Sequence, residues 1–228
     1  FYLVPRLPDV NSLRDYHLQT PLRVMSRDGK LISEFGEQRR IPLTIDQVPQ
    51  LYIDALLSAE DENFYSHYGV DPKALLRAAV RMVQAGGKIQ GGGSTITMQV
   101  ARNFFFHKRK EFTRKFNEIL LAFRIEEALS KEEILSLYAN KMFLGKTAYG
   151  FAAAAQVYYG KSLKELNLAQ LAMIAGLPKA PSAYNPIANL ERATERRDWV
   201  LGRMMKLGMI NNNQYQTAVS VIDNATYH

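Results

Sequence analysis

The sequence contains no cysteine, which excludes a disulfide scaffold and any metal site built on thiolates, and fits either the cytoplasm or the periplasm. No apolar run reaches the roughly 18 residues that a membrane-spanning helix needs. No charged segment followed by an apolar one marks an intact signal peptide. Low-complexity tracts and internal repeats are also absent. His67 and His107 each lack a second histidine at ligand spacing, so no zinc site is predicted.

What remains is the composition of a globular chain with an excess of positive charge. Its 228 residues and 47% hydrophobic content suffice for one large domain or two small lobes. The net charge of +7 favours an anionic partner, which can be nucleic acid, a phosphate-bearing substrate or anionic lipid. Residues 1–5, "FYLVP", read either as the stub of a membrane anchor or as an ordinary frayed terminus.

Periodicity predicts a mainly α-helical fold with one β-hairpin. Residues 1–43 form an extended lead-in, and "LRVMSRDGKLISEF" alternates around Asp28 and Gly29 as a hairpin does. Helical patterns then follow one another from residue 44 to residue 228, with no obvious interdomain linker.

Capping signals set the expected helix boundaries. Thr44 and Gln47 have the spacing of a capping box, which predicts a helix that runs to about Ala59. Asp71, followed by proline, starts the next helix. The segment "KEEILSLYANKMFLG" reads as a helix closed by Gly145.

Glu60 is the first candidate catalytic residue. It ends an apolar helix and opens the stretch "EDENFYSHYGVD", so its carboxylate is expected at the edge of packed structure. A partly buried carboxylate in that position suits a general base. The alternative is a solvated Glu-Asp pair at a helix end.

Glu118 is the second candidate. On a helical wheel it falls between Ile125 and Leu129, on an apolar stripe, with Arg114 one turn earlier on the same side. A carboxylate on an apolar stripe needs a partner, and Arg114 is the expected one, with Lys115 nearby. The alternative is a structural Arg–Glu pair between helices.

The stretch "GGGSTITMQVARN" has the features of a phosphate cradle. Its glycines allow close backbone approach, and the N-terminus of the following helix offers free N–H groups. Ser94, Thr95 and Thr97 add hydroxyl groups, but no Gly-Lys-Ser/Thr follows, so it is not a nucleotide P-loop. A plain loop with a helix cap is the alternative.

Aromatic and basic residues alternate in "NFFFHKRKEFTRK". The segment can stack bases and bind phosphates, or rest on a bilayer with Phe104–Phe106 in the acyl boundary and Lys108–Lys110 at the headgroups. A basic loop beside a core helix is the third reading. Lys179 lies in a stiff proline-flanked loop, where a cation would suit an anionic leaving group.

In this order, the motifs closely resemble the peptidoglycan glycosyltransferase domain, glycosyltransferase family 51, of bifunctional class A penicillin-binding proteins. The matching stretches are "EDENFYSHYGVD", "GGSTITMQVARN", "RKFNE", "KEEILSLYANKMFLG" (in part) and "ERATERRDWVL". They cover roughly residues 58–201, and the flanking stretches look most like the 1A type.

The resemblance implies a lysozyme-like α lobe and a smaller membrane-contacting jaw lobe at about 88–116, within a glycosyltransferase domain spanning 44–228. It implies that lipid II and the growing lipid-linked glycan are the substrates. Glu60 would deprotonate the acceptor GlcNAc 4-hydroxyl, which attacks C1 of MurNAc with inversion and releases undecaprenyl pyrophosphate. Glu118 would assist that departure or hold a divalent ion.

The resemblance also implies the remaining site residues and partners. The donor site would be lined by Ser94, Thr95, Gln99, Arg102, Arg114, Lys115, Lys179 and Ser182. Asp61, Phe64 and His67 would belong to the substrate-binding region, where Phe64 and His67 brace the turn. No cofactor is obligatory, although Mg²⁺ or Mn²⁺ can accompany the pyrophosphate. Inner-membrane lipid, moenomycin-type inhibitors and cell-wall synthesis proteins are the implied partners, without nucleic acid, on the periplasmic side of the bacterial inner membrane.

The chain departs from the family pattern at several positions. Met98 stands where a glutamine is usual, and Arg102 where lysine is common. Ser136 replaces the glutamate of the fourth motif, so a role for that carboxylate does not carry over. The transpeptidase domain, with its Ser-x-x-Lys nucleophile, is absent from these residues.

Two other function classes stay open at this point. A lysozyme-like hydrolase or lytic enzyme also needs two carboxylates, and would act on finished glycan. A basic module that binds nucleic acid or lipid would explain the charge and "FFFHKRK", but gives no reason for "EDENF" or for Glu118.

Overall fold

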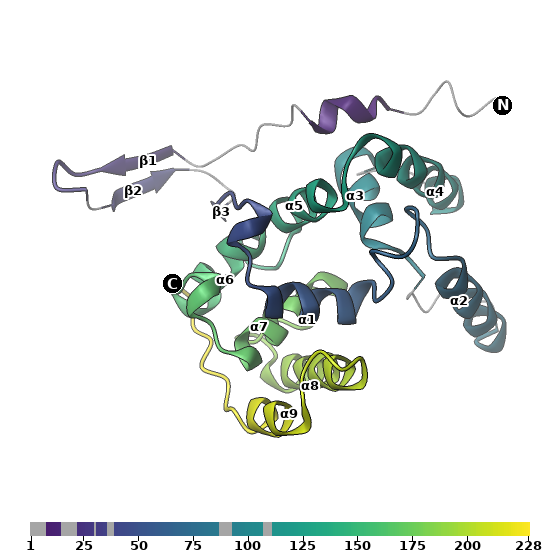
Figure 1. Ribbon diagram of the computed structural model, residues 1–228. Coiled ribbons are helices and arrows are strands. Elements are labelled where there is room, and N and C mark those ends of the chain that lie inside the picture. Colours follow the sequence, from purple (N-terminus) through teal and green to yellow (C-terminus); the bar gives the residue numbers. More distant parts are fainter. Residues whose placement is uncertain (1–7, 15–21, 30, 36–38, 87–92, 107–110) are drawn as a thin grey trace. The chain divides into compact units, whose positions relative to one another are not determined.

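The computed structural model describes residues 8–14, 22–29, 31–35, 39–86, 93–106 and 111–228 of the chain. The fold is mainly α-helical, as predicted (Figure 1). The longer helices are α1 (Gln50–Glu60), α2 (Pro72–Gln84), α3 (Ile96–Phe105), α4 (Glu111–Ala128), α5 (Lys131–Lys141), α6 (Phe151–Tyr159), α7 (Leu168–Gly176), α8 (Leu190–Lys206) and α9 (Asn212–Val219). Short 3₁₀ helices cover Val10–Leu13, Ile45–Gln47, Leu163–Glu165 and Leu177–Lys179.

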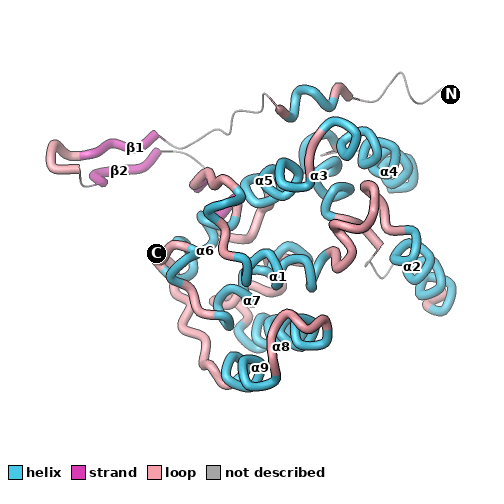
Figure 2. Tube along the Cα trace, in the orientation of Figure 1, coloured by secondary structure: helices cyan, strands magenta, loops and turns pink. Residues whose placement is uncertain are grey.

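Within the described residues, the few strands form two small pairs (Figure 2). β1 (Leu22–Met25) and β2 (Leu31–Phe35) make the antiparallel hairpin that Asp28 and Gly29 predicted. β3 (Arg39–Arg40) and β4 (Ala148–Tyr149) pair in parallel. The second pair was not predicted, because its strands are two residues long and more than 100 positions apart.

Two helix boundaries differ from the prediction for local reasons. The capping box of Thr44 and Gln47 closes a 3₁₀ turn, and α1 begins only at Gln50. α5 ends at Lys141, because the chain then turns to form the bridge between Phe143 and Tyr149. The prediction for α2 is confirmed, since the Asp71 side chain accepts from the Ala74 N–H and Pro72 occupies the first turn.

The chain divides into two compact units. Unit 1 comprises the described residues of 1–16 and 60–138, and unit 2 comprises those of 17–59 and 139–228. In unit 1, α3 packs against α4. In unit 2, α7 is buried from Ala169 to Gly176 and packs against α8. The ring of Tyr52 on α1 lies 4.6 Å from that of Phe151 on α6.

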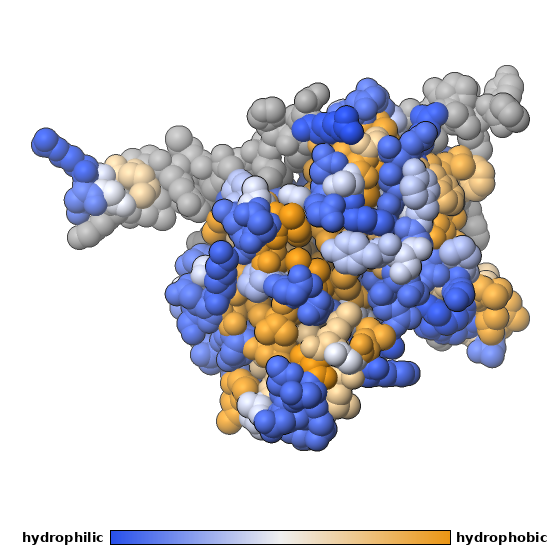
Figure 3. All heavy atoms as spheres, in the orientation of Figure 1, coloured by the Kyte–Doolittle hydropathy of each residue, from blue (hydrophilic) through white to orange (hydrophobic). Residues whose placement is uncertain are grey.

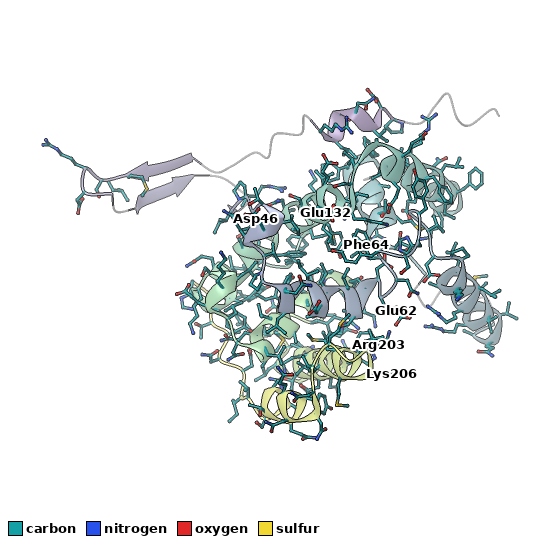
Figure 4. All side chains as sticks on the ribbon, viewed as in Figure 1. Asp46, Glu62, Phe64, Glu132, Arg203 and Lys206 are labelled. Carbon is teal, nitrogen blue, oxygen red and sulfur yellow. The ribbon has the colours of Figure 1, made fainter. Side chains whose placement is uncertain are left out.

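The fifth motif anchors the core of unit 2. The buried guanidinium of Arg197 donates to the carbonyls of Val219 and Val221, at 3.1 and 2.8 Å. Arg203, labelled in Figure 4, donates to the Ser58 carbonyl in the last turn of α1, at 3.4 Å. Cations near a helix C-terminus satisfy its orphan carbonyls, so α8 supports the end of the helix that carries Glu60.

Candidate active site

Glu60 is the last residue of α1 and is half-buried. Its Oε2 accepts a hydrogen bond of 3.0 Å from the amide Nε2 of Gln99 on α3. The Gln99 Oε1 in turn accepts from the buried hydroxyl of Tyr138, at 3.4 Å. An amide whose oxygen is engaged presents its NH₂ group to the carboxylate, so this chain of bonds orients Glu60.

The residues that follow Glu60 brace a turn against α3. Both carboxylate oxygens of Asp61 lie within 3.0 Å of His67 Nε2, and Oδ2 accepts from the Ile96 backbone N–H at 2.9 Å. Phe64 has no exposed surface (labelled in Figure 4) and stands edge-on to His67. These internal contacts favour a structural role for Asp61, Phe64 and His67 rather than contact with the substrate.

The turn closes at Gly69, which has a φ of +80°. A Cβ atom there would lie 2.7 Å from the Ala122 carbonyl oxygen on α4, so only glycine fits both the backbone conformation and the space. The Thr95 hydroxyl donates to the Gly69 carbonyl at 2.6 Å and also accepts from the Met98 N–H. Thr95 is therefore fully engaged as the N-cap of α3 and as a tie to the turn.

Burial of the second carboxylate follows the predicted stripe. Glu118 is 1% exposed, and Leu121 and Ile125 on the same side of α4 are fully buried. Its Oε2 lies 3.4 Å from Nζ of Lys115, which also donates to the hydroxyl of Ser94. Lys115 is thus one partner of Glu118, and the predicted contact with Arg114 lies outside the described side chains.

The segment from Ser94 to Gln99 contacts Glu60 directly and is linked to Glu118 through Lys115. Ser94 contacts Lys115, the partner of Glu118, and Gln99 binds Glu60. Ser94 lies two residues before the start of α3, and Gln99 is the fourth residue of that helix. This geometry supports the expectation that Glu60 and Glu118 serve one site in unit 1.

The remaining predicted site residues are distributed differently. Arg102 is half-buried in the last turn of α3, and Met98 is fully buried against Val70 and Ala122. Met98 therefore fills the core, where a glutamine would need a partner. Lys179 and Ser182 lie in unit 2, and both are exposed. Within unit 1, the structure places Gln99 against Glu60, His67 against Asp61, and Lys115 against Ser94 and Glu118.

Comparison with known proteins decides the family. Residues 28–205 match the family model described as transglycosylase. The chain belongs to the transglycosylase family. This is the peptidoglycan glycosyltransferase family, family 51, that the five motifs indicated, so that prediction is confirmed.

Individual relatives agree with this assignment. The chain is 61% identical to penicillin-binding protein 1A of Pseudomonas aeruginosa and 49% identical to that of Escherichia coli, each over the whole chain. It covers 28% and 27% of those proteins. It also resembles the crystal structure of penicillin-binding protein 1A from Haemophilus influenzae, with 35% identity, a TM-score of 0.56, and coverage of 93% of this chain and 22% of that one. The chain thus spans about a quarter of the length of these relatives.

Sequence reasoning missed a second polar cluster in this transglycosylase domain. The Thr97 hydroxyl donates to Glu126 Oε1 at 2.6 Å, and Lys131 Nζ donates to the same oxygen at 2.7 Å. Glu126 is 3% exposed in its side chain. The available signal was the position of Glu126, which lies eight residues after Glu118 and so on nearly the same face of α4.

Proposed function

We propose that this domain polymerises lipid II into β-1,4-linked glycan strands with inversion at C1 of MurNAc. Glu60 accepts the proton of the acceptor 4-hydroxyl while that oxygen attacks C1, and undecaprenyl pyrophosphate leaves with the electrons of the broken C1–O bond. General-base catalysis contributes roughly 10²–10⁴-fold. The observation that carries this proposal is the hydrogen bond from Gln99 to Glu60, which fixes a half-buried carboxylate in an internal network.

Charge on the departing pyrophosphate requires fixed donors. Lys115 supplies a cation and Ser94 a hydroxyl, close to the N-terminus of α3 with its partial positive charge. Glu118 lies against Lys115 and holds the ammonium in place. Arg102, Arg114, Lys179 and Ser182 remain proposed donor-site residues. Thr95 supports the site from within, through its bonds to Gly69 and Met98.

A divalent cation fits this site only together with the substrate. Among the residues that the structure describes, no group of three or more histidine, aspartate or glutamate side chains could hold a metal ion. Glu118 offers one carboxylate, and magnesium often binds through one or two carboxylates plus substrate phosphates. We therefore propose that any Mg²⁺ or Mn²⁺ arrives with the pyrophosphate and neutralises part of its charge.

The reaction class is tested by offering both kinds of substrate. We expect the chain to consume lipid II and form glycan polymer, and to release no soluble muropeptides from purified sacculi. A phosphoglycolipid donor-site inhibitor of the moenomycin type should stop the polymerisation. Release of muropeptides without consumption of lipid II would instead establish the alternative, a lysozyme-like hydrolase.

We further propose that the domain combines a lysozyme-like lobe with a membrane-contacting jaw, and that unit 1 carries the jaw. α2 has no buried residue, and Leu76, Val80 and Val83 are 68%, 48% and 75% exposed at helical spacing (Figure 3). On α4, Phe116 and Phe123 are 49% and 42% exposed. An amphipathic helix with an exposed apolar stripe and basic residues is suited to lie in the membrane interface.

This placement differs from the one expected from "NFFFHKRK". Phe106 is 5% exposed, and Phe104 and Phe105 are half-buried, so Phe106 packs inside unit 1. Residues 107–110 lie outside the described residues, as do residues 1–5. Within the described residues, no helix is long and apolar enough to cross a bilayer. We propose attachment to the periplasmic face of the bacterial inner membrane, together with other cell-wall synthesis proteins.

Replacing Leu76 and Val83 by serine should weaken binding to vesicles of phosphatidylethanolamine and phosphatidylglycerol. Full burial of one such side chain contributes about 1.5–3 kcal/mol. Because both side chains would insert only partly, the double variant should partition into the vesicles less strongly, by roughly tenfold or more. Co-sedimentation of the chain with vesicles measures the effect. The matched control is Ile222→Ser, since Ile222 is 90% exposed in unit 2. Equal losses for both variants would show that the apolar stripe of α2 has no special role.

A further inference from the structure

Lys131, the first residue of α5, forms a clamp on the turn that follows Glu60. Its Nζ donates to the backbone carbonyl of His67 at 2.8 Å and to Glu126 Oε1 at 2.7 Å. The same ammonium lies 4.4 Å from the centroid of the Phe64 ring. The side chain of Lys131 is 20% exposed, so these contacts are made in a largely dry environment.

Two of these three contacts are made with the turn itself. The ammonium has three N–H donors, and the ion pair with Glu126 engages one of them. The carbonyl of His67 and the face of Phe64 are additional ligands, and both belong to residues 61–69. The cation therefore joins this turn to α4 and α5.

The other side of the turn is held by α3. Asp61 accepts from the N–H of Ile96, and the carbonyl of Gly69 accepts from Thr95. Thr97 of α3 also donates to Glu126, the partner of Lys131. The turn is thus fixed at both ends by α3 and in the middle by Lys131, and Glu60 directly precedes it in the chain.

We propose that Lys131 is a positioning residue for Glu60. It holds the turn so that the Glu60 carboxylate stays on Gln99 and faces the acceptor hydroxyl. This inference rests on the proposed role of Glu60 as the base. A displacement of about 1 Å in a catalytic group can lower a rate by roughly 10²-fold, so a residue that touches only the turn can have a large effect on turnover.

The test replaces the ammonium while keeping the apolar stem. Lys131→Met is expected to lower kcat for lipid II polymerisation about 10–100-fold, with KM for lipid II changed less than about threefold, because substrate-binding groups stay in place. Lys131→Arg keeps a cation for Phe64 and Glu126 and should restore kcat to within about fivefold of the parent. The exposed Lys161 supplies the control, and Lys161→Met should leave both parameters unchanged.

Hydrogen exchange separates positioning from general destabilisation. In Lys131→Met, the amides of residues 62–69 should exchange faster, while those of α7 and α8 keep the rates of the parent chain. The double variant Phe64→Leu with Lys131→Met should lose no more kcat than the worse single variant, since both act through one turn. Faster exchange in α7 and α8 that accompanies the loss of kcat would overturn the proposal, because the effect would then be global.

Two further results separate the role of Lys131 from the assignment of Glu60 as the base. In the first, Lys131→Met keeps a normal kcat although residues 62–69 exchange faster, and Glu60→Gln is inactive. This result would overturn the positioning role of Lys131 and leave the proposed function standing. An active Glu60→Gln would show that another group is the base, and the inference about Lys131 would fall with that assignment. If Lys131→Met does not fold, the Lys131→Arg variant decides the question. A kcat that is still lowered more than about tenfold, while the hydrogen-exchange pattern of the turn is unaltered, would contradict positioning by the cation.

Discussion

Glu60→Gln is expected to abolish polymerisation of lipid II while leaving the fold intact. Glutamine has the same shape and its side-chain oxygen still accepts the hydrogen bond from Gln99, so the packing at the end of α1 is kept. It cannot take a proton from the acceptor hydroxyl, and loss of a general base lowers rates by roughly 10²–10⁴-fold. Initial rates of glycan formation from lipid II measure the loss, and circular dichroism checks the fold.

Glu62→Gln is the matched control for this variant. Glu62 lies two residues further along the same turn, is partly exposed, and faces Arg77 at 3.6 Å. An exposed pair of this kind contributes little, about 0–1 kcal/mol, so the rate should stay within about threefold of that of the parent. Normal polymerisation by Glu60→Gln would show that another group is the base.

Gly69→Ala is expected to be the most destabilising small substitution in unit 1. At a φ of +80°, a residue with a Cβ costs about 1–2 kcal/mol. The new Cβ would also lie 2.7 Å from the Ala122 carbonyl oxygen, and backbone in the middle of α4 yields only at a further cost of about 1–3 kcal/mol. The free energy of unfolding should therefore fall by about 2–5 kcal/mol, and turnover should fall with it because the turn moves.

Gly208→Ala isolates the contribution of close packing. Gly208 follows α8 with a φ of +73°, but a Cβ there meets no atom within 4 Å. Replacing Gly208 should cost about 1–2 kcal/mol, the same conformational cost as at Gly69 without the clash. Urea denaturation followed by circular dichroism compares the two variants. Equal losses of stability would mean that α4 yields to the added methyl group at no cost.

Much of the local structure could be predicted because its causes are local. The hairpin followed from Asp28 and Gly29, and the start of α2 from Asp71 and Pro72. Asn63 and backbone N–H groups donate to the Asp71 carboxylate. Burial acts to raise the pKa of Asp71, but these hydrogen bonds outweigh it and hold the pKa below its usual value. Signals of this kind lie within a few residues, so the sequence displays them directly.

The burial of Glu118 also followed from periodicity, while the bond between its partner Lys115 and Ser94 did not. A helical wheel placed it on the stripe of Leu121 and Ile125, which is fully buried. Lys115 contacts Glu118 and also Ser94, which lies 21 positions away from it in the chain. Sequence spacing along one helix contains no information about that contact.

The amino-acid sequence by itself determined the family and the helical fold and pointed to two candidate acidic side chains, because motif order and helical period are written along the chain. Only the tertiary structure decided what holds them. Gln99 approaches Glu60 from 39 positions away, and Lys131 reaches the carbonyl of His67 across 64. Such contacts depend on how α3, α4 and α5 pack in three dimensions, and packing is decided by complementary surfaces that no local pattern records.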